Sequence, residues 1–305
     1  MLHDLQDLLD HGDRVLIAMG GSSLTDLRTP TSDTDFFAIA DADLLPKVKR
    51  LITSRKRIDL EVRHVEWLDS ITARLLEYEA SVNAGPSEFS FWDLRFLTRI
   101  YLGRVLIQKG GVADKIASVH SQLRTTLATF FSSGFVTIYE DAVGLYLARR
   151  YEEILPISGE VAQRACLLAL LQTSLVDPSP KWAMTMARNS PNQQIRAGAE
   201  ELLKHLGSYS ESSSRQWVEK LLRLANCMVA IGVVASLAEN NNFTTALHSD
   251  ASGEVIESQP EWCVMGVPGY QTIVNTRNNK IMLCNLPFIV GLANAVATES
   301  EFVSV

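Results

Sequence analysis

The chain has 305 residues, enough for about two domains at ~100–200 residues each. Apolar residues make up 47% of it and charged residues 21%, which supports a buried core and excludes a wholly disordered chain. The 35 acidic and 28 basic residues give a formal net charge of −7, which argues against binding of nucleic acid through the whole surface and suits an enzyme whose small anionic substrate is held through metal ions.

Strand-like patterns dominate the first 67 residues. Continuous apolar runs of strand length and period-two alternation are typical of β-structure, whereas leucines spaced three and four apart favour a helix. A proline can occupy the first turn of a helix. The expected elements are a helix over 2–9, strands over 15–19 and 33–40, a helix from Pro46 to about Arg55, and a strand over 58–65.

Helical periodicity follows, and glycines and prolines divide it into segments. The expected helices cover residues 69–83, 89–108, 113–131, 135–153, 159–174, 181–188, 193–206 and 213–239. After them we expect short strands over 262–267, 270–275 and 280–284, a turn at 277–279 and a closing helix over 286–297.

The order of these elements predicts an α+β fold in three parts. An α/β domain with a small mixed sheet covers residues 1–67, a mainly helical domain covers 68–250, and a β-rich segment covers 251–305. Strands that are followed by runs of helices are typical of this class.

The cysteines and the N-terminus favour a cytoplasmic protein. The first fourteen residues are acidic and lack the apolar core of a signal peptide. The longest apolar run, 224–237, is shorter than the ~20 residues that a membrane helix needs. Four cysteines without a CxxC pair, in apolar surroundings, are typical of reduced buried thiols: Cys166, Cys227, Cys263 and Cys284.

The most informative segment is Gly21-Ser22, followed after nine residues by Ser32-Asp33-Thr34-Asp35. Side chains two apart on a strand project to the same face, so Asp33 and Asp35 can hold the same one or two Mg²⁺ ions. A Gly-Ser turn lets backbone N–H groups and hydroxyls approach phosphates closely. The expected phosphate contacts are Gly21, Ser22, Ser23 and Ser32.

A third carboxylate comes from the strand over 58–65. Glu61 is the expected residue, and Asp59, which projects from the same face, is the alternative. Three carboxylates in one cleft repel one another unless a cation is bound. This pattern is typical of metal-dependent phosphoryl transfer.

These residues resemble a known family. The run GSSLTDLRTPTSDTDFFAI resembles the signature of the DNA polymerase β-like nucleotidyltransferase superfamily, with the spacing of its small-molecule members. The run DLEV at 59–62 resembles the strand that bears the family's third carboxylate, which favours Glu61. The helical part, with RIYLGRVL at 99–106, is similar in architecture to aminoglycoside adenylyltransferases. The β-rich tail is not expected in those enzymes.

The resemblance implies a nucleotidyltransferase that uses Mg²⁺ and moves AMP from ATP to a hydroxyl of a small-molecule acceptor, releasing pyrophosphate. Asp33, Asp35 and Glu61 are then the catalytic and metal-binding residues. Lys181 either reaches the triphosphate or is a solvated lysine beside a core tryptophan. The pair Glu140-Asp141 either orients or deprotonates the acceptor hydroxyl or is a solvated surface pair. The alternatives are a peptide or protein acceptor and a non-catalytic nucleotide-binding protein. Neither a membrane nor a nucleic acid is expected as partner.

Overall fold

The chain folds into two compact units. The computed structural model describes residues 13–21, 33–41, 50–52, 57–79, 88–239, 262–265, 272–275, 280–283 and 289. Of these, the first unit takes the described residues up to 79, then 88–126 and 175–177, and the second takes the rest. The division lies elsewhere than at the expected boundaries after residues 67 and 250, because three helices group with the first sheet and the C-terminal strands group with the helices.

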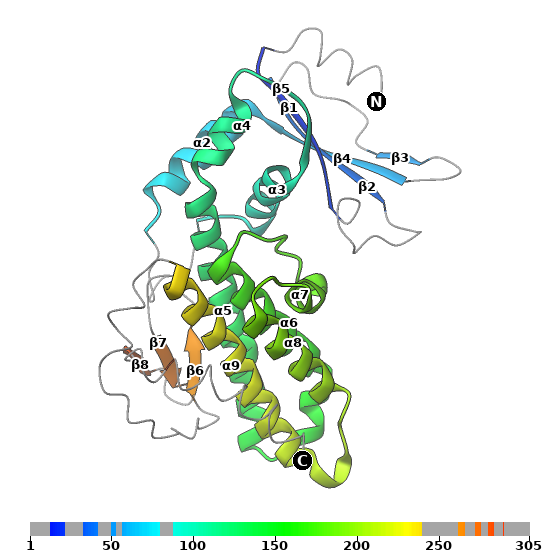
Figure 1. The fold of residues 1–305 in the computed structure, drawn as a ribbon, viewed down its shortest axis with the longest axis vertical. Helices are drawn as coiled ribbons and strands as arrows, with labels where there is room; N and C mark the ends of the chain where they lie inside the picture. Colours follow the sequence, from blue (N-terminus) through cyan, green and yellow to red (C-terminus); the bar gives the residue numbers. More distant parts are fainter. Residues whose placement is uncertain are drawn as a thin grey trace. The chain divides into compact units, whose positions relative to one another are not determined.

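The first unit contains a mixed sheet, drawn in blue shades with one green edge strand in Figure 1. Its strand order is β3-β4-β2-β1-β5. Strands β2 and β4 are parallel, and the other neighbours are antiparallel. The strands are β1 (Val15–Gly20), β2 (Thr34–Ala40), β3 (Arg50–Ile52), β4 (Arg57–His64) and β5 (Arg104–Lys109).

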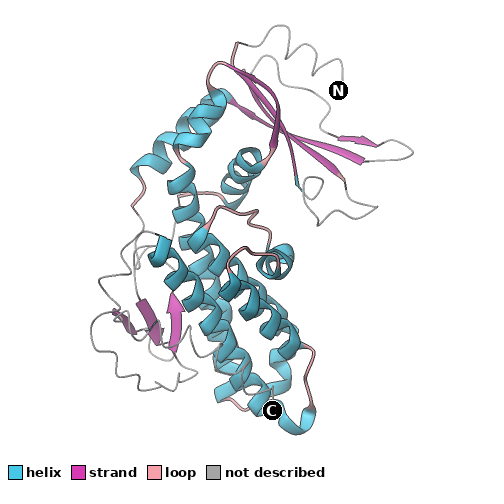
Figure 2. Cartoon of the chain, in the orientation of Figure 1, coloured by secondary structure: helices cyan, strands magenta, loops and turns pink. Residues whose placement is uncertain are grey.

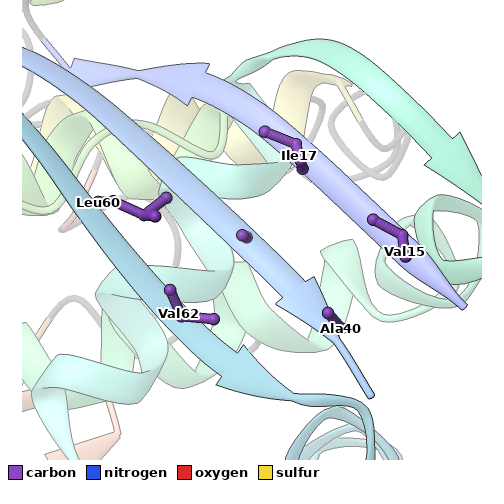
Figure 3. Close-up of a cluster of buried hydrophobic side chains, with 6 residues drawn as sticks. Val15, Ile17, Ala40, Leu60 and Val62 are labelled. Carbon is purple, nitrogen blue, oxygen red and sulfur yellow. The ribbon is translucent and has the colours of Figure 1, made fainter. Parts of the chain in front are cut away.

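One face of this sheet is apolar, as Figure 3 shows. The alternation of strand side chains puts small and branched apolar residues of β1, β2 and β4 together there. All members of this cluster are at most 7% exposed. Because neighbouring residues point the other way, the charged side chains of β2 and β4 lie on the opposite face. The cluster consists of Val15, Ile17, Ala38, Ala40, Leu60 and Val62.

Helix α3 (Phe91–Leu102) packs on the charged face of the sheet, where Phe96 meets Phe37 edge-on with ring centroids 5.7 Å apart. The helix begins at Ser90, whose hydroxyl accepts a hydrogen bond from the Trp92 amide at 3.2 Å. It ends at Gly103, where a Cβ atom would stand 2.9 Å from the carbonyl oxygen of Met19. The glycine therefore lets the end of α3 approach the end of β1. The other helices of this unit are α2 (Val65–Glu77) and α4 (Val112–Ser118).

The second unit is built mainly from helices, shown in cyan in Figure 2. Helices α6 and α9 pack closely, since a Cβ atom on Gly232 of α9 would stand 2.5 Å from the Ala169 Cα atom of α6. Strands β6, β7 and β8 form a second, antiparallel sheet in that order. The elements are α5 (His120–Leu147, which begins in the first unit), α6 (Leu155–Thr173), α7 (Pro180–Arg188), α8 (Gln193–Leu206), α9 (Ser214–Glu239), two short 3₁₀ helices (Tyr151–Ile154 and Glu211–Ser213), β6 (Trp262–Met265), β7 (Thr272–Asn275) and β8 (Lys280–Leu283).

The α6 region is apolar enough to raise the question of a membrane segment. Among the described residues, the stretch Tyr151–Thr173 has the length and composition of a membrane-crossing helix, with a mean hydropathy of 1.4. In this fold, 61% of the most apolar part of this stretch is buried. The core helix of a soluble protein has the same length and composition.

The predicted α+β fold is confirmed, and so are most of its strands. The strands expected over 15–19, 33–40 and 58–65 are β1, β2 and β4, and those expected after residue 262 are β6 to β8. The described cysteines, Cys166, Cys227 and Cys263, are buried and form no disulfide with one another, as expected, and burial raises the pKa of Cys166 to about 12. The helix over 2–9, the turn at 277–279 and Cys284 lie outside the described residues, and of the closing helix only Ile289 is described, buried.

Four expected helices differ from the structure, two of them because strand pairing overrides the local helical pattern. The helix expected to run to Arg55 contains β3, whose Leu51 pairs with Ile58 of β4. The helix expected over 89–108 stops at Leu102, and β5 then pairs with β1. In place of the helices expected over 113–131 and 135–153, the structure has the short helix α4 and then one continuous helix, α5, which runs through the expected break between them.

A buried asparagine in the apolar helix α9 connects strand β6 of the second sheet to the helices through hydrogen bonds. Asn226 is only 2% exposed. Its side-chain Nδ2 donates to the Tyr139 hydroxyl oxygen at 2.7 Å, and its Oδ1 accepts from the backbone N–H of Val264 in β6 at 3.0 Å. Because buried polar groups are costly without partners, this pair of bonds fixes how β6 lies against α9 and α5.

We expect Asn226→Leu to lower the free energy of unfolding by ~1–3 kcal/mol, since it leaves the Val264 N–H group and the Tyr139 hydroxyl without this partner. Tyr139→Phe, the control, should cost less because Asn226 keeps its bond to β6. Urea denaturation of both variants measures the two losses. An Asn226→Leu variant as stable as the wild type would contradict this role.

Candidate functional site

The charged face of the first sheet gathers carboxylates where β2 begins. Asp33 directly precedes β2 and Asp35 is its second residue, so both side chains project to the same face, as predicted. In the strand register Asp35 lies between Gly20 of β1 and Asp59 of β4. The site is therefore built from three neighbouring strands.

Gly21 directly follows the last residue of β1 and lies next to the Asp35 carboxylate. Its φ angle is +71°, in the left-handed region that favours glycine. A Cβ atom at this position would stand 2.1 Å from Oδ2 of Asp35. The backbone conformation thus favours glycine here, and any side chain at this position would displace the Asp35 carboxylate from where it lies.

Asp35 carries an unfavourable negative charge. Burial raises its pKa above the ordinary value, and the neighbouring carboxylates of Asp59 and Asp33 raise it further. The guanidinium groups of Arg99 and Arg95 act in the opposite direction without cancelling the rise. A cation bound at Asp35 would offset this cost.

Two arginines of β4 pair with the other carboxylates. Nη2 of Arg57 lies 2.8 Å from Oδ2 of Asp33 and 2.8 Å from Oδ2 of Asp59, so it bridges the two acids. Nη2 of Arg63 lies 3.1 Å from Oε1 of Glu61. These pairs are partly exposed, where ion pairs contribute little to stability. Their effect is to hold the carboxylates in position.

The register separates the two candidates for the third carboxylate. Asp59 is the partner of Asp35, whereas Glu61 is the partner of Phe37, one pleat further along the sheet. In the strand register the alternative, Asp59, is therefore the carboxylate level with Asp35. Glu61 nevertheless projects from the same face and borders the same cavity.

A cavity of about 410 Å³ lies over these residues. Strands β2 and β4 contribute its acidic side, and α3 contributes two arginines that the sequence analysis missed. They are four residues apart, so that helical periodicity puts both on one face of α3. This spacing was the available signal. The lining residues are Asp35, Phe36, Phe37, Asp59, Leu60, Glu61, Arg95 and Arg99.

The remaining predicted residues lie elsewhere or outside the description. Ser22, Ser23 and Ser32 lie outside the described residues. Lys181 belongs to the second unit, at the start of α7, with its Nζ 5.3 Å from the centre of the Trp182 ring. Glu140 also belongs to the second unit, and burial raises its pKa.

The donors at the sheet are of the type that Mg²⁺ prefers, and they carry surplus negative charge. Mg²⁺ is commonly held by one or two carboxylates together with water and substrate phosphates. Asp33 and Asp35 supply such a pair, and the raised pKa of Asp35 indicates uncompensated charge. Among the described residues, no group of three acidic, histidine or cysteine side chains is arranged to hold a metal ion by itself. The carboxylate pair by itself fits a cation of this kind, which takes its other ligands from water and phosphate oxygens.

Comparisons with known proteins add little. No protein-family model matches the sequence, and no curated protein matches it. One solved structure with some similarity is a nucleotidyltransferase-like protein from Exiguobacterium sibiricum, with 15% sequence identity and a TM-score of 0.38 over 85% of this chain and 83% of that one. A likeness this weak carries no argument about the activity of this chain.

We expect Gly21→Ala to be more destabilising than Gly111→Ala. Both glycines have a φ angle of +71°, but a Cβ atom on Gly111 would meet no other atom within 4 Å. In the control, Gly111→Ala, the free energy of unfolding should fall by about 1–2 kcal/mol, because alanine is strained in the left-handed conformation. Gly21→Ala should lose this and, in addition, the cost of turning the Asp35 carboxylate away. Urea denaturation measures both, and adding Asp35→Ala should remove the excess only at Gly21. Equal losses at the two glycines would contradict the close approach.

We expect Asp35→Asn to raise the melting temperature of the metal-free protein at neutral pH. The folded state raises the pKa of Asp35, so its ionised form costs stability at neutral pH, and this cost disappears below the ordinary value of 3.8, where both states are protonated. Asp69→Asn is the control of opposite sign, because bonds from Lys115 and Arg14 lower the pKa of Asp69. Asp69→Asn should lower the melting temperature at neutral pH, and this difference from the wild type should become smaller as the pH falls. Melting curves from neutral to acid pH test both, and destabilisation by Asp35→Asn at neutral pH would refute the expectation.

Proposed function

We propose that this chain is a Mg²⁺-dependent nucleotidyltransferase. It moves a nucleoside monophosphate, AMP from ATP, to a hydroxyl group of a small-molecule acceptor and releases pyrophosphate. The observation that carries the proposal is the pair Asp33 and Asp35 on one face, directly under the Gly21 turn, with a third acid beside Asp35 on β4. Paired carboxylates next to a close-approaching backbone are the arrangement that metal-assisted phosphoryl transfer requires.

Asp33 and Asp35 would hold the metal. When bound, Mg²⁺ neutralises the charge of the phosphate oxygens at the reacting centre. The surplus negative charge at Asp35 supports a cation there. Arg57, which bridges Asp33 and Asp59, keeps the acids from moving apart before the substrate arrives.

The other residues of the chain bind and orient the substrate. Gly21 lets the backbone approach the triphosphate, together with Ser22, Ser23 and Ser32, and we propose that Lys181 also contacts it. The acceptor hydroxyl oxygen attacks the α-phosphorus, and the new oxygen–phosphorus bond forms as the bond to the bridging oxygen breaks. Pyrophosphate leaves with that electron pair, and the hydroxyl proton passes to a carboxylate of β4.

Two carboxylates of β4 compete for the role of proton acceptor. The motif DLEV favours Glu61, which we propose for this role, and its side chain is one methylene longer. The register favours Asp59, which lies opposite Asp35. Both border the cavity. The two assignments predict opposite results for the variants below.

Pyrophosphate release from ATP and Mg²⁺ tests the proposal, with panels of small hydroxyl compounds and of serine-, threonine- and tyrosine-containing peptides as acceptors. Asp33→Ala and Asp35→Ala should abolish turnover in a folded protein, because each removes a metal ligand. Activity within tenfold of the wild type in either variant would refute the metal assignment. Turnover with peptides alone would identify a peptide acceptor, and ATP binding without turnover would indicate a non-catalytic protein.

The same assay separates the two acids of β4. Glu61→Gln should lower kcat by ~10²–10⁴ with ATP affinity nearly unchanged, whereas Asp59→Asn should lose less than about tenfold. Both substitutions keep the size of the side chain and remove its charge. Rates measured against Mg²⁺ concentration show whether either acid also binds the metal. If Asp59→Asn is the inactive variant, the third carboxylate is Asp59.

A further inference from the structure

The α3 side of the cavity is positively charged. Arg95 and Arg99 lie one helical turn apart and line the cavity of about 410 Å³ opposite the acids of β2 and β4. Phe96, between them in the sequence, packs edge-on against Phe37 of β2, with ring centroids 5.7 Å apart. This contact holds α3 on the sheet, and both arginines belong to the same compact unit as the acids.

Most charges around the cavity already have a partner of opposite sign. Nε of Arg99 lies 2.9 Å from Oδ2 of Asp177, in a pair that is mostly buried. Glu61 pairs with Arg63, and Asp59 pairs with Arg57. These pairs compensate one another and leave little charge for a ligand.

Arg95 is different. It is half-buried, and among the described residues it forms no ion pair. Its guanidinium lies 5.1 Å from the centre of the Trp92 ring, which is 60% exposed. Burial lowers the pKa of Arg95, and the charge of Arg99 lowers it further, against weaker attraction from Asp177, Glu61 and Asp35. The positive charge of Arg95 is therefore the one that an anion in the cavity would compensate.

We propose that Arg95, with Arg99 beside it, binds a phosphate group of a substrate in this cavity. A guanidinium presents parallel N–H donors that match phosphate oxygens, and partial burial strengthens such bonds. The two arginines face the acids across the cavity, so a phosphate there would lie between α3 and a cation held at Asp35. Anion binding itself does not need turnover, but its assignment to a substrate rests on the proposed nucleotidyl transfer.

Two sources of the phosphate share this chemistry: the polyphosphate of the nucleotide and a phosphate group on the acceptor. Arg95 could otherwise serve only to stabilise α3 itself, through its contact with Trp92 one turn earlier in the same helix. A purely structural arginine stabilises the fold, whereas an arginine kept for an anion, partly desolvated and repelled by Arg99, costs stability without it. The melting temperature therefore distinguishes a binding role from a structural role.

The experiment measures binding to the full chain by calorimetry, with Mg²⁺ present and no acceptor added. The probes are sodium tripolyphosphate, ATP, and tripolyphosphate added to ATP-saturated protein. The variants are Arg95→Gln, Arg95→Lys and the control Arg104→Gln, which removes the same charge from an exposed position on β5 of the same unit. Each variant is also melted without ligand.

We expect Arg95→Gln to bind tripolyphosphate ~10–100-fold more weakly, the range for loss of a charge-assisted hydrogen bond. Arg95→Lys should lie between it and the wild type, and Arg104→Gln should match the wild type. The ligand-free melting temperature of Arg95→Gln should be unchanged or higher. If ATP affinity falls in parallel, the phosphate is the nucleotide's. If tripolyphosphate still binds ATP-saturated protein, and only that binding depends on Arg95, the phosphate is the acceptor's.

The proposal is overturned if Arg95→Gln binds tripolyphosphate as the wild type does, or if its loss of affinity comes with a lower melting temperature that Arg95→Lys restores without restoring binding. These outcomes are separate from the fate of the proposed function. A protein that never releases pyrophosphate can still lose phosphate affinity with Arg95, and an active enzyme can retain it.

Discussion

The contact between Gly21 and Asp35 is the constraint on which the site depends. The left-handed turn at Gly21 brings the end of β1 against the Asp35 carboxylate, so that a methyl group there would push this carboxylate out of its position. The end of α3 lies against the same end of β1, because Gly103 has no side chain that would clash with the Met19 carbonyl oxygen. Two glycines thus allow a strand, a carboxylate and an arginine-bearing helix to meet around one cavity.

The charges around that cavity are only partly paired with one another. Arg57, Arg63 and Asp177 each neutralise a charged side chain that borders it. Asp35 and Arg95 form no ion pair among the described residues. Burial raises the pKa of Asp35 and lowers the pKa of Arg95, so that in each case it favours the neutral form. A metal ion at Asp35 and a phosphate at Arg95 would compensate both charges, which is the combination that a nucleotidyl transfer brings together.

The second unit uses a different principle, in which close apolar packing is fixed by a few buried hydrogen bonds. Gly232 lets α9 lie directly on Ala169 of α6, so that the two helices share a continuous core. Asn226, the polar residue in the same apolar helix, ties β6 to α9 and α5 through Val264 and Tyr139. Strand β6 is thus anchored on the helices by a directional contact, whereas apolar packing alone would leave its orientation open.

The sequence by itself determined what short-range periodicity encodes. A continuous apolar run located β1, and alternation located β2 and β4. Alternation also put Asp33 and Asp35 on one face, because side chains two apart on any strand point the same way. It could not decide whether Asp59 or Glu61 lies beside Asp35, since both obey the same alternation and only the pairing of β4 with β2 sets the register. Pairing also turned the predicted helical residues 104–108 into strand β5. Only the packing of α3 on the sheet brought Arg95 to the acids, because contacts between segments distant in the chain leave no local pattern in the sequence.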